Sequence, residues 1–230
     1  MTNTLHRQGS PESLRRDYVV FSTVANGHND QGAEEKKREF LRMAARHGPV
    51  NTAIVQEPEV VNEGAKWVWN SLAPPTVAVD QALEKFTGSA HATATFDNLD
   101  AVRGFVEELI RADMGISINI SGPLDEVGSC CRELGRKRHS AEHSLGVFGK
   151  KERLPSNQVL EISTMCGHGM VAFGLITKII DYIRLGILTP EEGAAYLARP
   201  CTCGAFNPSR AAELLESAHV EGGGSPSAPS

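Results

Sequence analysis

Short apolar runs alternate with amphipathic stretches through most of this chain, and this alternation restricts the fold more than any other feature. Strand-like runs occupy residues 18–24, 51–55, 91–96, 116–120, 143–148 and 159–164. Helix-like stretches lie between them, at residues 33–47, 57–72, 98–113 and 125–134. Strands that alternate with helices predict an α/β fold, a layered sandwich of a mixed sheet with helices.

The end of the chain is predicted to be an all-helical cap. Residues 170–185 are apolar nearly all round, as in a buried helix. The Thr-Pro-Glu-Glu run at 189–192 and the pair Asn207-Pro208 each indicate a helix start. We expect a flexible N-terminal segment at 1–16, an α/β core at 17–164, a helical cap at 165–219 and a disordered tail at 220–230.

Composition argues against several classes of protein. A net charge of −5 is unlike that of a general nucleic-acid binder, and 6% aromatic residues provide no stacking platform for single strands. The most apolar run, residues 170–188, contains Lys178, Asp181 and Arg184 and does not read as a membrane span. Five clustered cysteines are not typical of a secreted disulfide framework, so we expect a cytoplasmic protein.

Two cysteine motifs mark the predicted site. Cys166-Gly-His168-Gly follows the run at 159–164, and Cys201-Thr-Cys203-Gly lies between two helix signals. A helical hairpin over 170–198 would return Cys201 to the level of Cys166. Three thiols and an imidazole can hold zinc or an iron–sulfur cluster. We therefore predict an iron–sulfur cluster on the three cysteines, with zinc as the alternative and His168 as an acid/base or a fourth ligand.

Further residues complete this hypothesis. Gly169 and Asn207 lie at predicted helix starts, where free N–H groups attract anions. Arg210 could clamp a carboxylate in bidentate fashion, and Glu161, on the predicted strand before Cys166, could act as a general base. The prediction is a metal-dependent enzyme of lyase or dehydratase type that acts on a small anionic molecule. It includes no nucleic-acid or membrane partner and leaves a homo-oligomer open.

Two other functions stay open. The run Met-Cys-Gly-His-Gly at 165–169 resembles the catalytic-cysteine stretch of proline racemases, in which one thiolate abstracts a proton and a second cysteine returns it. This resemblance implies a metal-free racemase or epimerase that uses Cys166 and Cys203, the latter again followed by glycine. The remaining alternative is a zinc-stabilised accessory or interaction module without enzymatic activity.

Overall fold

The computed structural model describes residues 7–52, 83, 91–142 and 144–222, and the side chains up to residue 217. The helix predicted at 57–72 and the end of the strand predicted at 51–55 lie outside these residues. No helix in the described part of the chain is both long enough and apolar enough to span a bilayer.

Among the described residues, four strands form one sheet in the order β2-β3-β1-β4, and every pair of neighbours is antiparallel. The strands are β1 (Tyr18–Thr23), β2 (Asn51–Thr52), β3 (Thr93–Phe96) and β4 (Ser117–Ser121). Helix α2 (Ala33–Ala45) follows β1, and α5 (Leu99–Ala112) connects β3 to β4. This is the split βαβ arrangement: the strands that a helix connects run parallel, but another strand lies between them. The sheet is therefore antiparallel, where the sequence predicted a mixed one.

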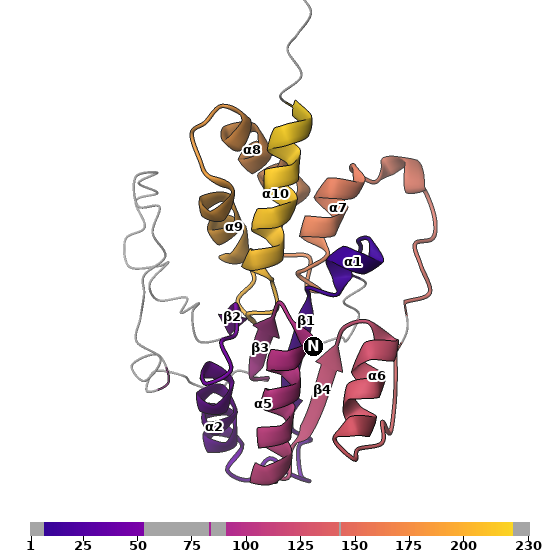
Figure 1. Ribbon diagram of the computed structural model, residues 1–230, viewed down its shortest axis with the longest axis vertical. Helices are drawn as coiled ribbons and strands as arrows, with labels where there is room; N and C mark the ends of the chain where they lie inside the picture. The colour runs from indigo at the N-terminus through magenta and orange to yellow at the C-terminus, as the bar shows by residue number, and fades with distance from the viewer. Residues whose placement is uncertain (1–6, 53–82, 84–90, 143, 223–230) are drawn as a thin grey trace, which may run out of the picture.

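Strand β1 contributes to two hydrophobic cores because its side chains alternate between the faces of the sheet. Tyr18 and Val20 belong to the core formed with α2 and α5. Val19 and Phe21 belong to the core formed with the C-terminal helices. Figure 1 shows α2 and α5 beside the sheet and the C-terminal helices beyond its upper end. A layered α/β fold with a helical C-terminal region, as predicted, is confirmed.

The C-terminal region contains four helices that pack on one another. The two predicted helix starts are correct: Thr189 and Glu192 form a complete capping box, and the side chain of Asn207 accepts a hydrogen bond from the N–H of Arg210. The helices are α7 (Asn157–Ser163), α8 (Phe173–Arg184), α9 (Pro190–Ala198) and α10 (Pro208–Gly222). Since α7 packs on α8 and α10, the helical region begins before the predicted boundary at residue 165.

Two predicted strands are wrong. The run at 159–164 belongs to helix α7, in which Val159, Leu160, Ile162 and Ser163 are buried. Leu160, Ile162 and Ser163 follow Val159 by one, three and four residues, which is the spacing of one helix face. The β-branched residues Val159 and Ile162, which suggested a strand, lie on that face. The described part of the run at 143–148 contains no strand and is exposed, apart from a half-buried residue 147.

The remaining described elements are short. They are α1 (Pro11–Leu14), α6 (Leu124–Glu133) and the 3₁₀ turn η2 (Lys151–Arg153). Helix α6 follows β4, and the loop after it leads to η2 and α7 (Figure 1). The side chain of Ser10 caps α1 by accepting a hydrogen bond from the N–H of Ser13.

Candidate thiol and imidazole site

The two cysteine motifs lie in the turns between the C-terminal helices. Cys166 and His168 occupy the turn between α7 and α8, and Cys201 and Cys203 occupy the turn between α9 and α10. Cys166 was expected at the end of a strand and directly before a helix. It follows a helix instead, and α8 begins seven residues later at Phe173.

The structure brings the four predicted side chains together. The Sγ atoms of Cys201 and Cys203 are 3.7 Å apart, and Cys203 Sγ is 3.7 Å from Nδ1 of His168. Cys166 lies near enough to Cys201 for the two thiols to shift each other's pKa. The contacts therefore run as a chain from Cys166 through Cys201 and Cys203 to His168. Cys166 and Cys201 are buried, while Cys203 is half-buried.

Hydrogen bonds favour the thiolate form at two of these cysteines. The Cys201 thiol lowers the pKa of Cys166 to about 5, and the N–H groups of Met170 and His168 add to this effect against the opposing effect of burial. A hydrogen bond from Cys201 likewise lowers the pKa of Cys203 to about 6, with help from the N–H of Ala205. The pKa of Cys201 itself is raised, because a neighbouring thiolate, that of Cys166 or that of Cys203, holds its single proton. The cluster thus holds a central thiol between two groups that ionise easily.

Alkylation should show this division in the metal-free protein. We expect iodoacetamide to label Cys203 with a rate that rises through about pH 6, instead of through about pH 8.5 as for an ordinary thiol, because the thiolate is the nucleophile. Mass spectrometry of peptides from a pH series would measure the rate. A free thiol such as N-acetylcysteine in the same pH series provides the comparison. Equal pH profiles for Cys203 and the free thiol would contradict the hydrogen-bond pattern.

The turn with Cys201 and Cys203 is bound to the rest of the fold by three consecutive carbonyl groups. Thr95 Oγ1 donates to the carbonyl of Gly204 over 2.8 Å, and Asn51 Nδ2 donates to that of Phe206 over 2.8 Å. Thr95 and Asn51 are partners in the β2–β3 register. The carbonyl of Ala205, between them, accepts a hydrogen bond from Arg7. Strands β2 and β3 therefore set the position of the cysteine turn.

Arg7 joins the two cysteine turns. Besides Ala205, its Nη2 atom reaches the carbonyl of Met165 over 3.2 Å, and its guanidinium pairs with the buried carboxylate of Asp17. No sequence motif indicates this role of Arg7, and residues 1–16 were predicted to be a flexible segment. The described part of that segment is instead packed against the C-terminal turns.

Arg210 and its neighbours form a structural network. The Arg210 guanidinium is buried and donates to Asp17 over 2.8 Å, to Ser13 over 2.9 Å and to the carbonyl of Gln8 over 2.6 Å. Glu161 lies on α7, and its Oε2 atom is 3.7 Å from Arg210 Nη2. These partners engage the Arg210 guanidinium, which the sequence analysis predicted to bind the carboxylate of a substrate.

Two further predicted residues, Asn207 and Gly169, have hydrogen-bond partners within the fold. The side chain of Asn207, which was predicted to bind an anion, donates to the carbonyl of Arg16 and to Asp17. Gly169 has a φ of +66° and its N–H closes a turn onto the carbonyl of Cys166, a backbone shape that favours glycine. Among the predicted residues, the structure gathers the thiols and His168 at one place and Arg210, Glu161 and Asn207 in a separate ion-pair network.

His91 is a nearby residue that sequence reasoning missed. Burial lowers its pKa, and the charge of His168 contributes, so the two imidazoles lie within electrostatic range. Its Nδ1 atom is 3.1 Å from the carbonyl of Ser22. The sequence did indicate where His91 lies, because this residue begins the alternating run that places Thr93 and Thr95 on the same face of the sheet.

The cluster supplies thiolates and an imidazole as potential metal ligands, but they are not arranged as a preformed metal site in the described residues. Across the described ranges, no group of three or more His, Cys, Asp or Glu side chains is preformed around a common centre as a metal site. The contacts link the four side chains pairwise.

Comparison with known proteins found no relative of this chain: no family model, no curated protein and no solved structure matches it.

Proposed function

We propose that Cys166, Cys201, Cys203 and His168 bind one zinc ion, which stabilises the junction between the helical region and the sheet. The observation that carries this proposal is the chain of three sulfurs and one imidazole nitrogen across two turns. Two of the thiols already favour the thiolate form that zinc requires. Binding would displace the proton of Cys201 and turn the four ligands toward one centre.

The spacing of the ligands suits a single ion. Two sulfurs bound to a tetrahedral zinc, each at about 2.3 Å, stand about 3.8 Å apart. The observed 3.7 Å between Cys201 and Cys203 is close to this distance. In the predicted cluster, with three cysteines and one open iron, each cysteine would bind a different iron, so its cysteines would stand further apart than this. We therefore favour the zinc alternative over the predicted cluster.

A structural role fits the site better than a catalytic one. Four protein ligands would fill a tetrahedral zinc and leave no position for substrate. Cys166 and Cys201 are buried, and Arg210, the group predicted to clamp an anion, is engaged by Asp17 and Ser13. We propose the zinc-stabilised module as the function, while lyase or dehydratase chemistry and a cytoplasmic location stay predictions from sequence.

Metal analysis of the purified chain tests the proposal. We expect about one zinc per chain, and cobalt exchanged into the site should give thiolate charge-transfer bands and the strong visible bands of tetrahedral coordination. Cys166→Ser should lose these signals. Cys131→Ser is the matched control and should keep them, because Cys131 lies outside the cluster. Bound iron with acid-labile sulfide would support the cluster instead, and absence of any metal from a chain that is stable in chelator would reject both.

A metal-free thiol enzyme is the second candidate, and one observation favours it. The lowered pKa values of Cys166 and Cys203 provide two groups that could remove and return a proton, as the resemblance to proline racemases implies. Hydrogen–deuterium exchange at the α-carbon of amino acids, retained after chelation and lost in Cys203→Ser, would support this candidate over zinc.

A further inference from the structure

Strand β4 lies at the edge of the sheet, and within the described residues it pairs only with β1. The N–H of Ser22 donates to the carbonyl of Ala92 on the β3 side. Because backbone groups alternate along an antiparallel strand, Phe21 and Thr23 then face β4. Their partners are Asn119 and Ser117.

Within the described residues, the backbone of β4 therefore offers a free pairing edge at Ile118 and Ile120. These residues alternate with Ser117 and Asn119, so their N–H and C=O groups point away from β1. No other described residue hydrogen-bonds to them. An edge with free backbone groups and no proline or charged residue in the strand is open to pairing with another chain.

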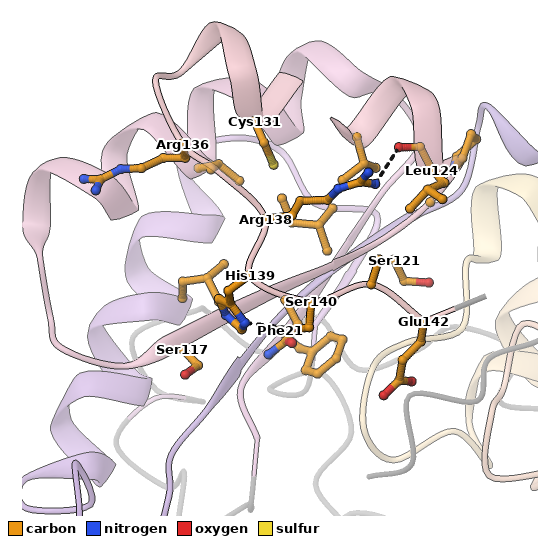
Figure 2. Close-up of a pocket in the computed structure, with 18 of the residues that line it drawn as sticks. Phe21, Ser117, Ser121, Leu124, Cys131, Arg136, Arg138, His139, Ser140 and Glu142 are labelled. Carbon is orange, nitrogen blue, oxygen red and sulfur yellow. Dashed lines mark hydrogen bonds between the residues drawn. The ribbon is translucent and has the colours of Figure 1, made fainter. Parts of the chain in front are cut away.

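A groove runs along this edge. Its volume is about 1520 Å³, above the 300–1,000 Å³ of typical small-molecule sites. Its lining includes Ile118 and Ile120, which pack against the core with α2 and α5, and Phe21, which belongs to the core on the other face of the sheet. The loop after α6 also lines the groove. Figure 2 shows His139 and Ser140 of this loop beside Phe21, with Ser117 and Ser121 close by. Such a groove has room for an extended segment between the strand and the loop.

The loop makes one wall of the groove basic. Arg136, Lys137, Arg138 and His139 are consecutive and exposed in a chain whose net charge is −5. In the described structure Arg136 and Lys137 have no ion pair, and Arg138 donates only to the carbonyl of Leu124. The carboxylates in the lining are Asp17, which is occupied by Arg7 and Arg210, together with Asp113 and Glu142.

Exposed apolar side chains stand on the same loop. Leu145 and Phe148 are 81% and 78% exposed, and both line the groove. Large apolar side chains beside a free strand edge are typical of a surface that a partner covers. The basic residues specify the charge of that partner, because complementary charge steers association.

We propose that the β4 edge binds an extended acidic segment of a partner protein as a fifth strand of the sheet. The segment pairs with the backbone of Ile118 and Ile120, its acidic side chains face Arg136 and Lys137, and its apolar side chains contact Phe148. This is strand addition, in which main-chain hydrogen bonds give affinity and side chains give specificity. It is independent of the proposed zinc site and goes beyond it.

Titration with model peptides tests the proposal on the full chain. The probe is a blocked, fluorescent peptide of about eight residues that alternates glutamate with valine, long enough to cover a five-residue strand. The control peptide has lysine in place of glutamate. Anisotropy measures binding, and amide hydrogen exchange measures protection at Ile118 and Ile120.

Two variants separate the backbone contribution from the charge contribution. Ile118→Pro removes an outward N–H without touching the ladder to β1, and Ile118→Thr is its matched control with the N–H retained. A combined Arg136→Glu and Lys137→Glu variant reverses the charge of the wall but leaves the strand intact. Circular dichroism of each variant verifies that the fold is preserved.

We expect saturable binding of the acidic peptide, protection of both amides, and affinity lowered about tenfold or more by Ile118→Pro and by charge reversal. Ile118→Thr should bind as the natural chain does. Equal binding of the lysine peptide, binding that charge reversal leaves unchanged, or unprotected amides at saturation would each overturn the proposal. Dimerisation that protects the same amides in the absence of peptide would also overturn it, in favour of a second copy of this chain.

Discussion

Cys201→Ser is expected to cause the largest loss of stability among single substitutions in the proposed zinc site. Cys201 is central, since it contacts both Cys166 and Cys203, and its side chain is buried between the two turns. Zinc held at about 1,000 times its dissociation constant would stabilise the fold by about 4 kcal/mol, and the variant would lose this contribution. Since 1 kcal/mol shifts the melting temperature of a chain of this size by about 2–4 °C, we expect a decrease of about 8–16 °C.

Differential scanning calorimetry with and without a chelator would measure this effect. The natural chain in chelator should melt near the temperature of Cys201→Ser, and the variant should not respond to chelator. Cys130→Ser is an unsuitable control because Cys130 is buried in the other half of the molecule, whereas the half-buried Cys131 allows a gentle substitution. Equal melting of the natural chain with and without chelator would contradict a stabilising ion.

Asp17→Asn is the second substitution with a large expected effect. The Asp17 carboxylate is fully buried and pairs with two guanidinium groups, those of Arg7 and Arg210. Removing its charge leaves Arg7 in a low-dielectric interior without its counterion, and leaves Arg210 only the 3.7 Å contact with Glu161. Breaking a buried pair in this way costs about 3–5 kcal/mol, so chemical denaturation should show a loss of that size.

The control for this substitution is an exposed carboxylate. Asp100 is 92% exposed and lies 3.7 Å from Arg103, an ion pair that solvent screens. Asp100→Asn should therefore change the free energy of unfolding by less than about 0.5 kcal/mol. A similarly small change for Asp17→Asn would show that Arg7 and Arg210 find other partners. Because Arg7 also binds the carbonyls of Met165 and Ala205, we expect Asp17→Asn to weaken zinc binding as well.

The proximity of the two cysteine motifs could be anticipated from the sequence because the helix boundaries that bring them together are local. The contacts of Arg7, Asn51 and Thr95 that hold the turn are remote in sequence and could not be anticipated. Strong helix starts at Thr189 and Asn207 fix where α9 and α10 begin, and the turn with Cys201 and Cys203 must lie between them. The apolar run before Thr189 predicted a helix, and α8 does return the chain toward Cys166. The expected burial on all sides is wrong, because only the face with Ile176, Ile179, Ile180 and Ile183 is buried. The prediction therefore depended on helix lengths, which periodicity shows well.

Two features that the sequence analysis missed, the helix α7 and the structural role of Arg210, depend on contacts between residues that are far apart in the sequence. Val159 and Ile162 suit strands by intrinsic preference, but they fill one face of α7 against α8 and α10. Arg210 finds Gln8, Ser13 and Asp17 about 200 residues earlier in the chain. Neither pattern nor spacing reveals such a partner, so a cation at a helix start suggested a ligand where the fold supplies a carboxylate.

Strand β1 is buried on both faces, and this couples the unfolding of the two halves of the molecule. Val19 and Phe21 belong to one core, and Tyr18 and Val20 belong to the other. Loss of packing in either core would therefore disturb β1 and, through this strand, the other core. Heating should accordingly produce a single calorimetric peak, and a chain cut before α7 should leave both fragments without native cooperativity. The halves that look separable along the sequence are expected to melt as one unit.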